Sequence, residues 1–309
     1  MKHSAGCGII RGVREKLAIA LVALMLLLAV LPYFGTWAWW LDMLNHFRLQ
    51  LAVVSLVVAV IVLAVVRKRW ASVGLLAVAA HAAPVGWTAF QPDGPGSGAS
   101  FAHANVGGCD PAAVRAWVSD LDAAAVFLLE VRPEDELART PPEGWRFLLQ
   151  RPSDDTRGLI VLVPKWSVIN KAHVESFSVP GTIRDMAVVD LGGVEVMQAH
   201  LARPGTACGF AEQVAMSEAI ADWVVSRSEW TDVLVVGDFN AAPWSAAVKP
   251  LRDAGLSPAR GGLSGTWPAQ LPPGLRVPID HAFSNRRCKV TVGPDLGGDH
   301  RPIVVRMTE

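Results

Sequence analysis

The stretch 233–240 reads VLVVGDFN and ends in two side chains that can do chemistry. An apolar, mostly β-branched run is typical of a strand buried on both faces, and Gly237 indicates a sharp turn after it. Asp238 and Asn240 lie two residues apart, so they point the same way from an extended chain. A carboxylate beside a carboxamide suits a metal-assisted phosphate site. The tetrapeptide GDFN at 237–240 also fits an ordinary strand followed by an Asx turn.

Polar residues also end other apolar segments of the chain. A single Glu after a strand is usually a solvated loop residue, and a single His within QAHL is usually a satisfied core group. Two Asp-His dipeptides and GDFN at strand ends of one domain are harder to attribute to chance. We therefore predict that these strand ends meet in one site, at Asn105, Glu130, His200, Asp238 with Asn240, Asp280 with His281, and Asp299 with His300.

These residue types fit the hydrolysis of a phosphate ester. Hard oxygen ligands such as Glu130 and Asp238 suit Mg²⁺ or Mn²⁺, and Mg²⁺ keeps several of its waters. A His held by an Asp can take a proton from the attacking water or stabilise the developing charge. We predict His300 as the base, with Asp280 as its orienting carboxylate.

The remaining polar residues have predicted roles around that pair. His200 would donate to the phosphoryl group or to the leaving oxygen. Asn240 and Asn105 would position water and phosphate. Arg157, just before Gly158, would reach a substrate phosphate, and the alternative is a solvated arginine.

At these residues the chain resembles the endonuclease/exonuclease/phosphatase superfamily, with its deoxyribonuclease-I-like fold. The resemblance spans about residues 100–307. Within the superfamily, the chain is most similar to a bacterial membrane-anchored branch. It implies a two-sheet α/β sandwich with the site at one edge, and divalent-metal hydrolysis of a phosphoester. The motifs follow the order of the family: NV at Asn105, LLEV at Glu130, QAHL at His200, VVGDFNAAPWS from Val235, TWP at Thr266, PIDHAFSN from Pro278 and GDHRPIVV from Gly298.

The resemblance also implies roles for single positions. It places the metal-binding acid at Glu130 and a second metal-site or phosphate-site acid at Asp299. The water-orienting pair falls on Asp238 and Asn240, and the catalytic histidine on His300.

Three motifs depart from the family pattern. Gly298 replaces the usual serine, so we expect Asp299 to be held more loosely. Two glycines, Gly107 and Gly108, replace a polar residue that often follows NV, and LLEV replaces the commoner LQEV beside Glu130.

The segments between these motifs alternate between strand and helix patterns. We predict many strands and few helices, which favours stacked sheets flanked by helices. Asp110 is a suitable N-cap, with Pro111 at the first helical position. Predicted strands are 100–106, 124–130, 145–150, 159–163, 168–179, 182–190, 194–200, 233–240, 277–284, 288–292 and 302–307, predicted helices are 111–121, 211–226 and 245–254, and a hairpin is predicted at Gly192 and Gly193.

The first 90 residues are predicted to be a membrane anchor with three transmembrane helices. Apolar blocks cover about 17–31, 47–66 and 70–90. A cleaved signal peptide is the alternative for the first block, but no small-residue cleavage site follows it. Residues 91–99 read as a Gly/Pro linker, and 100–309 as the endonuclease/exonuclease/phosphatase domain.

The distribution of charge predicts the orientation. Basic residues precede the first block and separate the second from the third, so both segments should be cytoplasmic. Three spans then place the domain after residue 90 outside the cytoplasmic (inner) membrane. Eight of the 28 Lys/Arg and two of the 28 Asp/Glu lie in residues 1–90, which leaves 20 basic and 26 acidic residues beyond. An outer domain of this balance lacks the basic footprint of a non-specific nucleic-acid binder.

The four cysteines show no zinc-binding spacing. Cys7 is predicted on the cytoplasmic side, and Cys109, Cys208 and Cys288 outside. A disulfide between Cys109 and Cys208 is one prediction, and buried free thiols are the equal alternative.

Together these features predict a membrane-anchored, divalent-metal-dependent phosphoesterase. Its substrate is a phosphodiester or phosphomonoester in a nucleic acid, a lipid head group or a small molecule. The competing hypothesis is a catalytically silent, membrane-tethered binding domain of the same fold, which would have lost metal and catalytic residues. No protein partner can be predicted.

Overall fold

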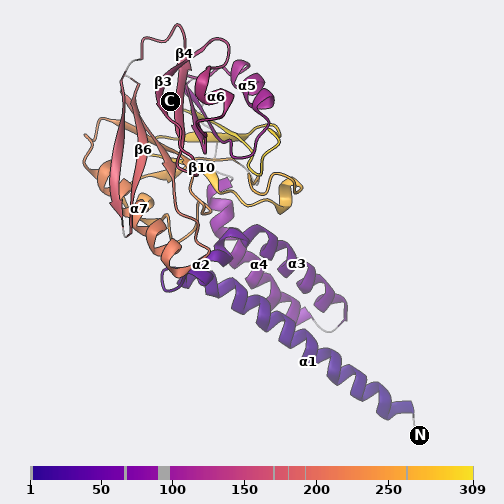
Figure 1. Cartoon of the computed structure of the whole chain (residues 1–309). Coiled ribbons are helices and arrows are strands. Elements are labelled where there is room, and N and C mark those ends of the chain that lie inside the picture. Colours follow the sequence, from indigo (N-terminus) through magenta and orange to yellow (C-terminus); the bar gives the residue numbers. More distant parts are fainter. Residues whose placement is uncertain are drawn as a thin grey trace. The chain divides into compact units, whose positions relative to one another are not determined.

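A computed structural model describes residues 3–65, 68–89, 98–169, 171–179, 181–191, 193–261 and 264–308. The chain divides into two compact units, Met1–Trp87 and Thr88–Glu309 (Figure 1). We refer to them as the N-terminal unit and the C-terminal unit. Most of the predicted linker, 91–97, lies outside the described residues.

The N-terminal unit is entirely helical. It contains α1 (His3–Val30), η1 (Leu31–Phe34), α2 (Trp39–His46), α3 (Arg48–Val65) and α4 (Lys68–Ala89). Val22 of α1 packs with Val62 of α3 in a small buried cluster, and many other large apolar side chains of these two helices are exposed. Among the described helices, two are long and apolar enough to cross a membrane, at Gly12–Phe34 and Arg48–Val65. The third predicted span contains a shorter apolar helix, Trp70–Gly86.

The C-terminal unit is built on two mixed sheets of six strands. The first contains β1 (Ser100–Asn105), β2 (Ala125–Leu129), β3 (Trp145–Arg151), β4 (Leu159–Pro164), β11 (Cys288–Val292) and β12 (Ile303–Met307), in the order β11-β12-β1-β2-β4-β3. The second contains β5 (Ala172–Val179), β6 (Thr182–Asp190), β7 (Val194–His200), β8 (Asp232–Asp238), β9 (Ser257–Pro258) and β10 (Asp280–Ser284), in the order β5-β6-β7-β8-β10-β9. In each sheet one central pair is parallel, β1 with β2 and β7 with β8.

Helices cover the outer faces of both sheets. The first sheet packs against α5 (Pro111–Ser119) and α6 (Glu136–Arg139), where Trp117 and Leu137 join its outer core. The second packs against α7 (Ala207–Val225) and α8 (Lys249–Asp253), and Met216 and Leu251 join that core. The predicted two-sheet α/β sandwich is therefore confirmed.

The core between the sheets is built by alternation along each strand. Phe101, Phe127 and Leu234 point into it, whereas residues one position away, such as Ala102 and Val233, face the helices. This two-residue period continues to the strand ends. It therefore decides which polar residues reach the space between the sheets.

Several predicted boundaries agree with the structure, and others differ for local reasons. The strands 182–190, 194–200 and 288–292 are correct. Asp110 caps α5 by accepting from the Ala112 N–H, as predicted, and α7 begins four residues early because Thr206 caps it. The predicted helix 245–254 is reduced to α8, and its N-terminal part forms turns instead. Gly192 of the predicted hairpin lies outside the described residues, although β6 and β7 do pair antiparallel.

Candidate active site

The polar residues of the candidate site extend the core between the sheets. On β1, Asn105 follows Phe101 and His103 at spacings of two, and on β8, Asp238 follows Leu234 and Val236. The parallel register pairs His200 with Asp238, and the antiparallel register pairs Asp238 with Asp280. Strand register alone thus brings residues from three strands of the second sheet to one edge.

Two carboxylates share one amide at this edge. Asn105 Nδ2 donates to Glu130 Oε1 at 2.9 Å and to Asp238 Oδ2 at 3.2 Å. Asn105 Oδ1 in turn accepts from the Gly107 N–H. Asn105 therefore holds Glu130 of the first sheet and Asp238 of the second sheet close together. The sequence prediction did not assign this role to Asn105.

Glu130 and Asn240 have unusual backbone conformations. Among the described non-glycine residues, only these two have positive φ, at 58° and 48°. Left-handed conformations cost free energy in residues with a Cβ and concentrate at functional sites. At Asn240 the backbone N–H donates to Asp238 Oδ1 and the side-chain Nδ2 donates to the Leu201 carbonyl oxygen. The strained turn thus fixes the orientation of Asp238.

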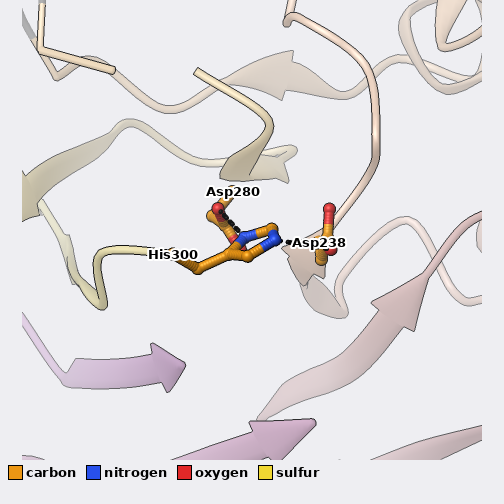
Figure 2. Close-up of side chains that lie close together, drawn as sticks. All are labelled: Asp238, Asp280 and His300. Atoms are coloured by element: carbon orange, nitrogen blue, oxygen red, sulfur yellow. Dashed lines mark hydrogen bonds and ion pairs between the residues drawn. The ribbon is translucent and has the colours of Figure 1, made fainter. Parts of the chain in front are cut away.

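His300 and Asp280 form the predicted pair. His300 Nδ1 lies 2.8 Å from Asp280 Oδ2, and His300 Nε2 lies 3.8 Å from Asp238 Oδ2 (Figure 2). On the other side of Asp280, Nε2 of the fully buried His103 lies 3.4 Å from Oδ1. The Asp280 backbone N–H also donates to Thr266 Oγ1. Asp280 is therefore fixed by two imidazoles and a backbone hydrogen bond.

The buried charges shift the pKa values of the pair. Burial alone lowers the pKa of His300, but the charge and hydrogen bond of Asp280, with Asp238 and Asp299, outweigh it and raise the pKa to about 10. Burial alone raises the pKa of Asp280, but His300 and His103 bring it below its usual range. In the metal-free protein His300 is therefore an imidazolium at neutral pH.

The pKa values of a neighbouring acid, Asp238, and a neighbouring histidine, His200, shift in the directions opposite to those of Asp280 and His300. Burial, followed by the charge of Asp280, raises the pKa of Asp238. Burial lowers the pKa of His200 in spite of Asp238 and Glu130, whose oxygens lie 3.8 and 3.7 Å from its Nε2. His200 is therefore a neutral imidazole that can donate one N–H to the site.

This electrostatic arrangement predicts how stability depends on pH without metal. The His300 pKa is above its ordinary value of 6.5 in the folded state, so its stabilising effect is fully present below about pH 6.5 and is lost as the pH rises through about 10. We expect the melting temperature of the full-length chain, in detergent and EDTA, to exceed that of His300→Gln most at low pH. A difference that stays constant from pH 6.5 to 10 would contradict the assignment.

Asp299 is held by a tryptophan. Its side chain is 53% exposed, its Oδ2 accepts from Trp267 Nε1 at 3.2 Å, and its Oδ1 lies 4.0 Å from His300 Nε2. A Cβ at Gly298 would lie 2.6 Å from Cys109 Sγ, so the thiol occupies the space that a serine side chain would need. The expected loss of support at Gly298 is thus offset by Trp267.

The predicted disulfide is absent from the described residues. Cys109, Cys208 and Cys288 are all free thiols. Cys109 lies half-buried against Gly298, and burial raises its pKa to about 11, so the thiol stays protonated. Cys208 is exposed in the first turn of α7. The prediction of a Cys109–Cys208 bond is therefore wrong. The alternative of buried free thiols is correct for Cys288 alone among the three, because Cys109 is half-buried and Cys208 is exposed.

The sequence prediction assigned no role to three neighbours of the site. These are His103, Trp267 and Arg203, whose Nη2 lies 3.7 Å from Glu130 Oε1. The alternation of β1 placed His103 on the face of Asn105, which is a signal that the sequence did contain. His281, by contrast, is structural: its ring stacks on Phe239 and its Nε2 lies 2.8 Å from the Ala241 carbonyl oxygen.

The donor set fits a divalent cation. Glu130, Asp238, Asp280 and Asp299 gather at one edge, and the first three are largely buried. Within the described part of the chain, ligand atoms of Asp238, Asp280 and His300 approach within 4.8 Å of one another. Asp280 and His300 are hydrogen-bonded to each other. The carboxylate oxygens of Glu130, Asp238 and Asp299 are therefore better placed as metal ligands. Hard oxygen donors of this kind suit Mg²⁺ or Mn²⁺.

Fold and site together define a class, the metal-dependent hydrolases of phosphoric esters. The family model for the Endonuclease/Exonuclease/phosphatase family matches residues 102–300, which is more than half of the 309-residue chain. The protein belongs to this family. No curated protein matches the sequence.

Solved structures share the fold at low sequence identity. A truncated TDP2 from Caenorhabditis elegans has a TM-score of 0.53 and 18% identity, covering 69% of this chain and 98% of that one. A 3'-5' exonuclease from Neisseria meningitidis has a TM-score of 0.54 and 14% identity, covering 68% and 100%. An AP endonuclease from Archaeoglobus fulgidus has a TM-score of 0.53 and 14% identity, covering 68% and 99%.

Gly107 lies directly against the side chains of Glu130 and Asn105. A Cβ there would lie 2.5 Å from Glu130 Oε2 and 3.3 Å from Asn105 Oδ1. We expect Gly107→Ala to displace Glu130 and to lower phosphoesterase kcat/KM by about 10²-fold, the usual effect of a small misplacement. Gly205→Ala is the matched control, because nothing lies within 4 Å of its Cβ. Equal activity of the two variants would show that the position of Glu130 is not critical.

Proposed function

We propose that the chain is a membrane-anchored, divalent-metal-dependent phosphoesterase that acts outside the cytoplasmic membrane. The observation that carries this proposal is the buried His300–Asp280 pair, whose free Nε2 faces Asp238 while Asp238 is joined to Glu130 through Asn105. A scaffold domain has no need of such an arrangement, because a buried ion pair is often no more stabilising than apolar residues of the same volume.

Glu130 and Asp299 are the metal ligands that we propose, with water and substrate oxygens completing the coordination. Mg²⁺ or Mn²⁺ would neutralise a non-bridging phosphoryl oxygen when bound. Glu130 is kept in place by Asn105, Arg203 and its own strained backbone. Asp299 is kept in place by Trp267.

The other side chains supply proton transfer and positioning. The raised pKa of His300 favours the stabilising role over the role of base, since an imidazolium Nε2–H donates to a phosphoryl oxygen. Asp238, whose pKa burial and Asp280 raise, is then the stronger acceptor for a proton of the attacking water. Neutral His200 donates to the leaving oxygen. Asn240 orients Asp238 and the water.

An assay of several substrates side by side tests the reaction class. Bis-p-nitrophenyl phosphate, plasmid DNA and lysophospholipid would be offered to the purified full-length chain with Mg²⁺ or Mn²⁺. We expect hydrolysis of at least one substrate and its loss in Asp238→Asn. If no substrate is hydrolysed, or if Asp238→Asn is as active as the wild type, the result favours the competing hypothesis of a silent binding domain.

The anchoring and the side of the membrane have a separate test. The proposal rests on two helices of sufficient length and apolar composition, on the additional apolar stretch Trp70–Gly86, and on the basic residues near 11–16 and 67–69. An alkaline phosphatase reporter fused after Met307 should be active in whole cells. An inactive reporter on a membrane-associated chain would place the C-terminal unit in the cytoplasm.

A further inference from the structure

Four large apolar side chains of the C-terminal unit are left in solvent far from the candidate site. Val168 is 93% exposed, Trp230 85%, Trp166 80% and Val225 70%. Every other large apolar side chain among the described residues of this unit is less exposed. Single exposed apolar residues are ordinary on protein surfaces, whereas a group of them at one place marks an interaction site.

Strand direction places all four residues at one edge of the sheets. Val225 and Trp230 precede β8, whose last residue, Asp238, belongs to the candidate site. Trp166 and Val168 follow β4, which runs antiparallel to β2 and therefore starts at the site end of β2. We refer to this end of the sheets as the distal edge. Because β8 contains seven residues, about 20 Å separates the distal edge from the catalytic residues.

Both loops that carry the tryptophans are held by hydrogen bonds. Arg146 donates through Nη2 to the carbonyl oxygens of Ser167 and Ile169. In the other loop, Asn285 Nδ2 donates to the Thr231 carbonyl oxygen at 2.8 Å. The two tryptophans next to these contacts are thus presented on fixed backbone, so their exposure is a property of the fold.

Charge does not favour an acidic or a basic partner at the distal edge. Three neutral ion pairs lie there, Lys171 with Asp190, Arg227 with Glu195 and Arg286 with Asp232. The residues that precede the two tryptophans, Lys165 and Glu229, have opposite signs. Tryptophan favours the boundary between water and lipid, because its ring is apolar and its N–H needs a polar partner. The surface of a lipid bilayer therefore fits this edge.

The chain also enters the C-terminal unit at the distal edge. β1 begins at Ser100 and runs parallel to β2 toward the candidate site. Eight residues, 90–97, separate Ala89 at the end of α4 from Gly98. A chain of this length spans at most about 30 Å. With α4 in the proposed anchor, the distal edge is thus kept within reach of the bilayer surface.

We propose that the distal edge rests on the lipid bilayer, with Trp166 and Trp230 inserted among the head groups. This inference rests on the proposed membrane anchoring. It turns the catalytic edge away from the bilayer, so the substrate reaches Glu130 and His300 from the water. The phosphoester is then a water-soluble compound, and phospholipids of the bilayer that holds the chain are excluded.

Fluorine NMR of the full-length chain in lipid nanodiscs tests this contact. The tryptophans are replaced by 5-fluorotryptophan, and signals are assigned from the variants Trp166→Phe, Trp230→Phe and Trp267→Phe. A gadolinium chelate on the lipid head groups broadens signals close to the bilayer surface. We expect the signals of Trp166 and Trp230 to be lost. Trp267, which contacts Asp299 at the catalytic edge, should keep its signal, because paramagnetic broadening falls steeply with distance.

A double variant shows whether the two tryptophans make the contact. Trp145 is buried in β3 beside the end of β4, so its signal reports how close the distal edge lies to the bilayer. We expect this signal to be broadened in the wild type and to recover in Trp166→Ser/Trp230→Ser. Leu275→Ser is the matched control, since it removes an exposed apolar side chain from the loop 268–276 beside the candidate site. It should leave the Trp145 signal broadened.

The signal of Trp37 separates failure of this inference from failure of the anchor. Trp37 is an exposed residue between the first two predicted spans. If its signal is lost while those of Trp166 and Trp230 stay sharp, the anchor is correct and the contact is wrong. Loss of the Trp267 signal would place the catalytic edge at the bilayer and overturn the inference. If none of these signals responds, the anchoring is wrong and the inference falls with it.

Discussion

Asp238→Asn is expected to lower metal-dependent phosphoesterase activity by about 10²–10³-fold or more, the usual cost of removing a preorganised charged group at a reacting centre. Asp238 is the point where the site's contacts meet. Asn105 donates to one of its oxygens and the Asn240 N–H to the other, and His300 Nε2 lies 3.8 Å away. An amide of the same size would keep the shape and remove both the negative charge and the proton acceptor.

Asp253→Asn is the matched control for this variant. Asp253 is an exposed residue of α8 whose carboxylate pairs with Lys249. Exposed pairs of this kind contribute little to stability, so the control should retain full activity. Initial rates with bis-p-nitrophenyl phosphate, together with a melting curve of each protein, would separate loss of catalysis from loss of fold. If Asp238→Asn is folded and fully active, Asp238 has no catalytic role.

His300→Gln is expected to lower kcat by about 10²–10³-fold, the usual cost of removing a preorganised donor to a developing charge. Its Nε2 is the charged donor that faces the proposed phosphate, and Asp280 holds the ring through Nδ1. Glutamine can donate one hydrogen bond but cannot carry the positive charge. The effect should therefore fall on kcat more than on KM.

Two further variants place this result in context. His173→Gln, at an exposed residue of β5 near Glu175, should leave kcat unchanged. His103→Gln should give an intermediate loss, because His103 contacts Asp280 and not the reacting groups. A loss in His173→Gln as large as that in His300→Gln would mean that the effect is not specific to the site.

The sequence predicted much of the candidate site because its residues follow the ends of apolar strands. Glu130, His200, Asp238 and His300 were all expected at one edge. Strand register pairs His200 with Asp238 there, and Glu130 and His300 lie near these two residues. The alternation of β10 also explains which half of the Asp280-His281 dipeptide belongs to the site. Asp280 faces the space between the sheets, whereas His281 faces Phe239 on the other side.

Contacts between distant segments could not be predicted in the same way. His103 meets Asp280 across 177 residues of sequence, and Trp267 reaches Asp299 from a loop without regular structure. These pairs depend on how the two sheets stack, and local periodicity contains no information about stacking. The position of the Cys109 thiol could not be predicted for the same reason, because it depends on the packing of Sγ against the distant Gly298.

Dependence on a divalent metal is the central claim, and its most direct test is metal removal followed by metal addition. The full-length chain treated with EDTA should lose phosphoesterase activity and regain it with Mg²⁺ or Mn²⁺, and the metal should raise its melting temperature. Glu130→Gln should show neither the recovery nor the rise in melting temperature at the same metal concentration. Activity that persists in EDTA, or a Glu130→Gln protein that responds to metal as the wild type does, would contradict the account.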